Sequence, residues 1–160
     1  MDLICIDLEA SGLSTDSYPI EVAWKNAITG QSDNFLINPE SAADWDHWDE
    51  FAEEVHGIDR ELLCLDGVDI YTACEKLRAL AGKRVISDAV QFDHFWLSRL
   101  YAAAEETMPF RLVGLEELLN EKQLVAYSVL TKGQHRRHRA KQDVDDILAN
   151  ITLLLENGTA

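Results

Sequence analysis

The feature that most constrains the fold is a short apolar run at residues 2–8, Asp-Leu-Ile-Cys-Ile-Asp-Leu, which Ser11 and Gly12 close as a turn. A run of this length bounded by turn residues indicates a buried strand. Acidic residues, Asp7 and Glu9, stand at its far end. Because side chains two residues apart on a strand point to the same face, we expect both carboxylates on one side of a sheet.

The segments that follow predict a mixed sheet. Residues 19–28, which contain Ile20, Val22, Trp24 and Ile28, predict a strand, and residues 32–38 predict a return strand. The Thr29-Gly30 turn between them favours antiparallel pairing. Beyond them the pattern predicts helices at 46–55, 71–81, 93–104, 115–120 and 140–156, with short strands at 83–87 and 110–112. Three antiparallel strands followed by alternating helices and strands favour an α/β fold, a mixed five-stranded sheet with helices on both faces. Sites in such sheets lie at the carboxyl ends of central strands.

Length and cysteine usage narrow the class of protein. The 160 residues are the size of one ordinary domain, so we expect a single domain over residues 1–160. An odd number of cysteines, Cys5, Cys64 and Cys74, argues against a secreted fold built on disulfides. The sequence has neither a signal-peptide pattern nor the roughly 20 apolar residues of a membrane helix. We therefore expect a cytoplasmic protein with no membrane partner.

The formal net charge of −15 disfavours nucleic-acid binding, which normally uses a basic surface. Carboxylates that hold metal ions are neutralised by those ions, however, and basic residues can be concentrated locally. Five of the 14 Lys and Arg residues gather in one segment: Lys132, Arg136, Arg137, Arg139 and Lys141. A solvated loop is the alternative explanation, and His138 in the middle of the segment favours a functional one.

Acidic residues recur where predicted elements begin or end. Asp7 and Glu9 would repel each other unless a cation lay between them, and a hard divalent ion with oxygen ligands meets that need. Asp93 opens a predicted helix, while His138 and Asp143 stand at the start of the last one. Each has an ordinary alternative, such as an exposed acidic loop or a helix-terminal residue. The hypothesis of a metal site therefore depends on the whole set.

As a set these residues resemble the DEDDh exonucleases, an RNase H-like group that includes polymerase proofreading subunits, oligoribonucleases and RNase T-like enzymes. The resemblance covers nearly the whole chain. Residues 7–13, Asp-Leu-Glu-Ala-Ser-Gly-Leu, are similar to the first motif of the family, and residues 53–58 to its His-Gly-Ile segment. Phe92-Asp93 is similar to the second motif and His138-x-Ala140-x-x-Asp143 to the third.

The second motif departs from the family pattern. His-Asn-Ala usually precedes x-Phe-Asp, whereas residues 87–91 of this chain read Ser-Asp-Ala-Val-Gln, with one extra residue. Either Asp88 or Asp93 therefore supplies the second-motif carboxylate. Phe92 before Asp93 and the apolar helix after it favour Asp93.

The resemblance implies a metal-dependent 3′-to-5′ exonuclease that hydrolyses phosphodiester bonds at the 3′ end of single-stranded DNA or RNA and releases nucleoside 5′-monophosphates. It implies two Mg²⁺ or Mn²⁺ ions bound by Asp7, Glu9, Asp93 and Asp143, with His138 as the general base. The substrate-binding residues it implies are Ala10, Ser11, Gly12, Leu13, His56 and Phe92. The partner would be a nucleic-acid 3′ end. Members of the family often form dimers, so the resemblance also allows a homodimer.

Two other functions compete with this one. An endonuclease of the same fold is the first. A catalytically weak or inactive RNase H-like module that binds nucleic acid or another partner is the second, favoured by the charge of −15 and the altered second motif. The sequence does not separate DNA from RNA. The cluster of Trp45, His47 and Trp48 predicts either a stacking platform for bases or a lid packed on the core.

Overall fold

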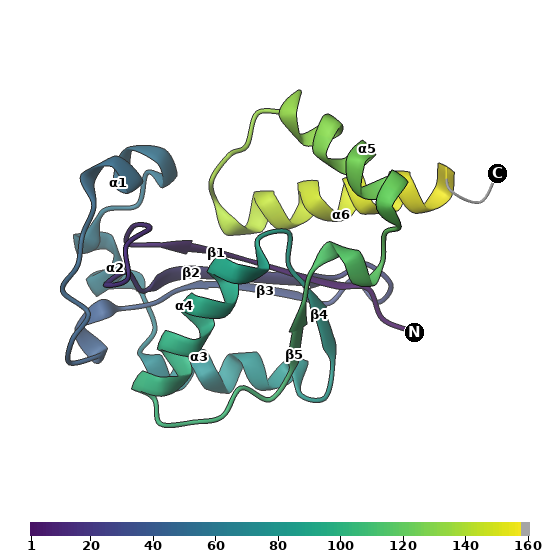
Figure 1. The fold of residues 1–160 in the computed structure, drawn as a ribbon. Helices are drawn as coiled ribbons and strands as arrows, with labels where there is room; N and C mark the ends of the chain where they lie inside the picture. Colours follow the sequence, from purple (N-terminus) through teal and green to yellow (C-terminus); the bar gives the residue numbers. More distant parts are fainter. Residues whose placement is uncertain (158–160) are drawn as a thin grey trace.

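The computed structural model describes residues 1–157 and confirms the predicted mixed sheet (Figure 1). The strands are β1 (Ile4–Ala10), β2 (Pro19–Asn26), β3 (Ser32–Leu36), β4 (Arg84–Ile86) and β5 (Arg111–Val113). They form a five-stranded sheet in the order β3-β2-β1-β4-β5. The first three strands pair antiparallel, and β4 and β5 run parallel to β1. The strand that carries the acidic pair is therefore central.

Helices cover both faces of the sheet, with α5 and α6 on one side and α3 and α4 on the other (Figure 1). The helices are α1 (Glu50–His56), α2 (Arg60–Asp66), α3 (Ile70–Leu77), α4 (Val90–Ala103), α5 (Glu121–Lys132) and α6 (Ala140–Asn157). Short 3₁₀ helices lie at Pro39–Ser41, Arg78–Leu80 and Leu115–Glu117. Within residues 1–157, no helix has the length and apolar character needed to cross a bilayer.

Two predicted helices were wrong in their limits. The helix predicted at 46–55 begins only at Glu50, because the Asp49 side chain accepts a hydrogen bond from the Phe51 amide and caps it there. The helix predicted at 115–120 is a 3₁₀ turn, and α5 begins after it. Asn120 and Gln123 form a capping box, which sets that start. The short helix α2 was not predicted.

The side chains of β1 alternate between the two layers. Ile4, Ile6 and Leu8 belong to the core shared with α3 and α4, whereas Cys5 belongs to the core beneath α6. Asp7 and Glu9 follow Cys5 on the α6 face by the same alternation. The strand thus places both carboxylates where the apolar layer under α6 ends.

The core under α4 offers a test of the fold. Leu97 has no exposed surface, and truncating such a leucine destabilises a protein by about 2–5 kcal/mol. We expect Leu97→Ala to lower the free energy of unfolding by that amount in urea denaturation. The matched control is Val125→Ala on α5, where Val125 is exposed and the change should stay within about 0.5 kcal/mol. Equal effects of the two substitutions would contradict this packing.

Candidate active site

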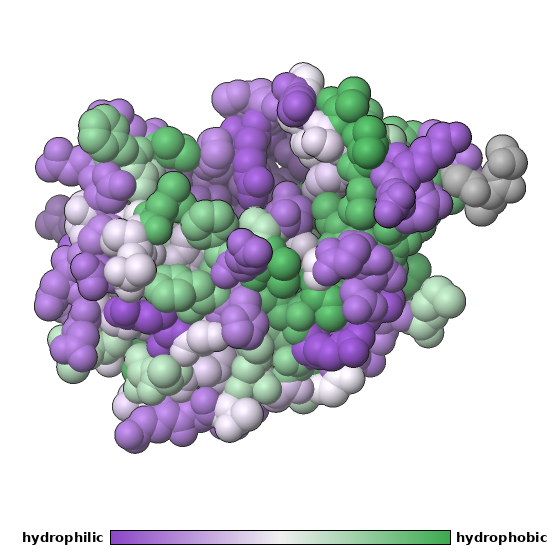
Figure 2. Space-filling model, viewed as in Figure 1, coloured by the Kyte–Doolittle hydropathy of each residue, from purple (hydrophilic) through white to green (hydrophobic). Residues whose placement is uncertain are grey.

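The candidate site lies at the carboxyl end of β1, at the edge of the sheet where the sequence predicts one. Ligand atoms of Glu9, His138 and Asp143 all lie within 4.8 Å of one another. Asp7 and Asp143 are bridged by the Arg136 guanidinium, at 3.0 and 3.2 Å. The structure therefore brings residues from β1, from the α5–α6 loop and from α6 into one cluster. Figure 2 shows a recess lined with hydrophilic side chains between α1 and the α5–α6 pair.

A buried carboxylate on β2 positions the start of α6. Glu21 is 3% exposed and accepts hydrogen bonds from Arg139 Nη2 and from the Ala140 amide, each at 2.7 Å. A carboxylate at a helix N-terminus satisfies a free amide and meets the positive end of the helix dipole. Because Glu21 lies opposite Glu9 in the β1–β2 ladder, the anchor fixes the first turn of α6, and with it Asp143, over the end of β1.

His138 directly precedes this anchored turn. Its φ is +56°, in the left-handed region that non-glycine residues rarely adopt. Such a conformation persists only where surrounding contacts hold it, which here come from Arg139 and Ala140 on Glu21. The side chain lies beside Glu9 and Asp143 and lines the adjoining cavity.

The carboxyl groups of Asp7, Glu9 and Asp93 hold protons more tightly than usual. Burial and the charge of Asp143 raise the pKa of Glu9 to about 9. Burial and the charge of Asp93 raise the pKa of Asp7 well above its usual range. Burial raises the pKa of Asp93 to about 7, although the Ser87 hydroxyl donates to it at 2.6 Å. Crowded carboxylates in a dry site disfavour one another's ionisation, and a bound cation reverses that effect.

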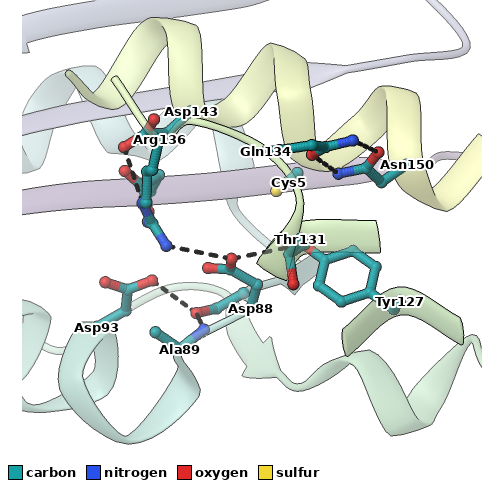
Figure 3. A network of polar contacts seen from close by, with 12 residues as sticks. Cys5, Asp88, Ala89, Asp93, Tyr127, Thr131, Gln134, Arg136, Asp143 and Asn150 are labelled. Atoms are coloured by element: carbon teal, nitrogen blue, oxygen red, sulfur yellow. Dashed lines mark hydrogen bonds and ion pairs between the residues drawn. The ribbon is translucent and has the colours of Figure 1, made fainter. Parts of the chain in front are cut away.

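Both candidates for the second-motif carboxylate lie at the cluster (Figure 3). Asp93 is buried in the first turn of α4 and receives the Ser87 hydrogen bond. Asp88 lies 3.5 Å from Arg136 and accepts a hydrogen bond from Tyr127 at 3.4 Å. The altered second motif thus places the Asp88 carboxylate beside Arg136, while the charge of Asp93 still acts on Asp7.

The donor set fits a hard divalent cation. In residues 1–157, three buried carboxylate oxygens lack a hydrogen-bond partner: Asp7 Oδ2, Asp88 Oδ1 and Asp143 Oδ1. Buried acceptors without partners are costly, and a cation among them removes that cost. Carboxylate oxygens are the ligands that Mg²⁺ and Mn²⁺ prefer in proteins.

A cavity of about 300 Å³ adjoins the cluster. Four of the predicted substrate-binding residues line it: Ala10, Gly12, Leu13 and His56. Of the other two, Phe92 lines a neighbouring hollow that it shares with Leu13. Ser11 is buried, and its hydroxyl contacts the Tyr18 amide and His47 Nδ1, which makes it part of the turn.

The buried His56 has a defined proton arrangement. Its Nδ1 accepts a hydrogen bond from the Ile58 amide at 3.0 Å, so the proton of the neutral ring is on Nε2. Burial lowers the pKa of His56, which keeps the ring neutral. His56 therefore carries a neutral Nε2–H donor, which is buried in the wall of the cavity.

The first helix contributes cavity residues that the sequence analysis missed. Phe51 and Val55 line the cavity and are 79% and 51% exposed. They are four residues apart on α1, a spacing that usually marks a core-facing stripe. The spacing of Phe51 and Val55 would therefore have predicted a core contact, whereas both side chains face a cavity that is open to solvent.

The tryptophan cluster packs on the core, which is one of its two predicted roles. Trp45 is buried and stacks on Tyr18, with ring centroids 5.0 Å apart. Trp48 contacts His56 edge-on and donates to Glu53. A side chain at Gly12 would place its Cβ 2.6 Å from His47, so Gly12 is needed for this packing. The stacking-platform alternative is not supported.

The basic segment does not form a free phosphate-binding stripe. Arg136 pairs with Asp7, Asp88 and Asp143, and Arg139 pairs with Glu21. Arg137 lies 3.5 Å from Asp146. Three of its five basic residues thus pair with acidic groups of the protein itself.

Known proteins resemble this chain in structure, whereas no family model and no curated protein matches its sequence. E. coli Exonuclease I in complex with a dA16 oligonucleotide superposes with a TM-score of 0.72 at 14% identity, over 98% of this chain. A zinc-bound complex of E. coli Exonuclease I with single-stranded DNA gives 0.69 at 16% identity over 95%. The chain shares its fold with a part of Exonuclease I.

The match extends beyond one organism. The moderately thermophilic Exonuclease I from Methylocaldum szegediense has a TM-score of 0.63 at 15% identity, over 94% of this chain. The chain spans only about two fifths of the Exonuclease I structures, 41% and 40% of their lengths. At these identities the similarity to Exonuclease I establishes the fold alone, and it agrees with the predicted five-stranded mixed sheet with helices on both faces.

The raised pKa of Glu9 predicts how stability depends on pH in the presence of a chelator. Between its ordinary pKa of 4.5 and about 9, the folded state holds a proton that the unfolded state has lost, so stability falls as pH rises through this window. Glu9→Gln does not titrate and should lose less stability. We expect it to be about 1–3 kcal/mol more stable than the wild type at pH 8 and close to it at pH 4.5.

Urea denaturation at pH 4.5 and pH 8 in EDTA measures this difference. Glu54→Gln, at an exposed position on α1, is the control and should follow the wild type. Identical pH dependence in wild type and Glu9→Gln would contradict the assigned environment of Glu9.

Proposed function

We propose that this chain is a metal-dependent 3′-to-5′ exonuclease that removes nucleotides from single-stranded nucleic acid. The observation that carries the proposal is the position of Glu9, His138 and Asp143 within 4.8 Å of one another, beside a cavity, in the fold of Exonuclease I. Similar structures are complexes of Exonuclease I with single-stranded oligonucleotides, which supports a linear polymer as substrate.

The carboxylates are the expected ion ligands. Asp7 has an unpartnered buried oxygen, and the charges of both Asp93 and Glu9 raise its pKa. Asp7, Glu9, Asp93 and Asp143 would together hold the ions. Mg²⁺ or Mn²⁺ held by these carboxylates would lower the pKa of a bound water and offset the negative charge that develops on the phosphate.

The remaining residues hold the substrate and move the proton. His138 lies at the cavity wall beside Glu9, where its imidazole can accept a proton from the attacking water. His56 can donate its Nε2 proton to the terminal sugar or phosphate. Leu13, Phe51 and Val55 form an apolar rim suited to the last base. Attack on the phosphorus breaks its bond to the preceding 3′-oxygen, so the product is a nucleoside 5′-monophosphate.

One observation favours the competing function, a binding module without hydrolytic activity. Arg136 already supplies a positive charge to three carboxylates of the cluster. If that pairing were permanent, the site would have no need of ions. The release of mononucleotides in Mn²⁺ separates the two functions, because a binding module releases none.

Substitution of the general base tests the mechanism. We expect His138→Ala to lower the rate of mononucleotide release by about 10²–10⁴-fold, the usual contribution of a positioned base. The assay uses 5′-labelled single-stranded DNA and RNA oligonucleotides in Mn²⁺, in which shortening from the 3′ end gives a ladder. His135→Ala, an exposed histidine of the same loop, is the control and should keep the wild-type rate. A single internal cut in the wild-type reaction would instead indicate an endonuclease.

Two amide variants identify the second-motif carboxylate. Asp93 is buried, and its charge acts directly on Asp7, so we expect Asp93→Asn to reduce release by more than about 100-fold. Asp88→Asn should reduce mononucleotide release by less than about tenfold, because the Asp88 carboxylate already contacts Arg136 and Tyr127. Comparable losses in the two variants would show that both carboxylates are needed.

A further inference from the structure

Arg136 reaches into the carboxylate cluster from the loop between α5 and α6 (Figure 3). Its Nη2 lies 3.0 Å from Asp7, its Nε 3.2 Å from Asp143 and its Nη1 3.5 Å from Asp88. One guanidinium thus contacts carboxylates from a strand, a helix and the segment after β4. The DEDDh resemblance assigns no part to this position.

The guanidinium satisfies these carboxylates only in part. It contacts one oxygen of each, and the second oxygens, Asp7 Oδ2, Asp88 Oδ1 and Asp143 Oδ1, have no partner among residues 1–157. A single positive charge also faces a cluster that includes Glu9 and Asp93. With Arg136 in place, the site therefore keeps acceptor oxygens without partners and more carboxyl groups than one guanidinium can pair.

The arginine and the carboxylates differ in how firmly they are held. Asp7 and Asp143 are 1% and 2% exposed on β1 and α6. Arg136 has a side chain 42% exposed, in the segment 134–139, which is neither helix nor strand. Its side chain can leave toward solvent without breaking core packing, whereas the carboxylates cannot move without disturbing the sheet or α6.

We propose that Arg136 is an internal counter-ion that stabilises the ion-free site and is displaced when divalent cations bind. This inference rests on the proposed function, because the same carboxylates take the ions. When one partner of a buried ion pair is removed, the other is left as an uncompensated charge. The stability of the ion-free fold therefore depends on the arginine. The arginine in turn competes with the ions and weakens their binding. Ion affinity is thus set by an internal competitor as well as by the ligands.

Calorimetric titration with Mn²⁺ and thermal unfolding of the chelator-stripped chain test the proposal together. We expect Arg136→Gln to bind Mn²⁺ about tenfold more tightly than the wild type, which corresponds to about 1.4 kcal/mol. The same variant should melt at a lower temperature in EDTA and gain more from Mn²⁺ than the wild type gains.

Arg137→Gln is the matched control. Arg137 is the adjacent residue of the same loop and pairs with Asp146 at the surface, so the variant should match the wild type in both measurements. Arg136→Lys keeps the positive charge and loses the planar fork, so its Mn²⁺ affinity should fall between those of wild type and Arg136→Gln. If Arg136→Gln unfolds in EDTA, Arg136→Lys provides a folded variant in which the competition with Mn²⁺ is weaker than in the wild type.

The outcomes separate this inference from the proposed function. Unchanged or weaker Mn²⁺ binding by both Arg136 variants overturns the inference, and the exonuclease proposal stands if the wild type binds Mn²⁺ and releases mononucleotides. If the wild type binds no Mn²⁺ and releases nothing, while the variants also bind none, both proposals fall. Tighter binding confined to the Arg136 variants supports the internal counter-ion, whether or not hydrolysis is detected.

Discussion

Carboxylates crowded at the end of a buried strand need positive charge among them, and much of the local structure serves that need. Asp7 and Asp143 are almost fully buried, and an uncompensated buried charge costs several kcal/mol. The fold meets this constraint with Arg136, which enters the cluster from the loop that joins α5 to α6. The raised pKa values of Asp7 and Glu9 indicate that the compensation is incomplete. A site that still favours protonation at neutral pH is a site suited to additional cations.

Two arginines three residues apart have different parts in this arrangement. Arg139 is committed to Glu21, in a pairing through Nε and Nη2 that also includes the Ala140 amide. That contact fixes the start of α6 on β2, and the charge of Arg139 also acts on Glu9. Among the described residues, Arg136 is the arginine whose guanidinium contacts Asp7, Asp88 and Asp143. The net charge of −15 is therefore compatible with a phosphate-handling site, because its acidic groups are compensated locally and not by a basic surface.

The part of the candidate site that lies on β1 could be predicted from the sequence, because it depends on short-range rules. The period of a strand placed Asp7 and Glu9 on one face, and their position at the end of an apolar run placed them at the sheet edge. Arg136 was counted only as part of a basic segment, because a loop residue's partners are decided by tertiary contacts. The pairing of Glu21 with Arg139 spans 118 positions. A glutamate inside the apolar strand at 19–28 was its only sequence signal.

The loop that carries His138 is tied down on both of its sides by these ion pairs. Arg136 holds it to the carboxylate cluster, and Arg139 holds it to Glu21. The left-handed backbone of His138, which costs about 1–3 kcal/mol, lies between the two attachments. If cations displace Arg136, the attachment on the helix side remains, so the imidazole keeps its anchor while the preceding part of the loop gains freedom. The same exchange that admits the ions would then open the loop to substrate without detaching the proposed base from α6.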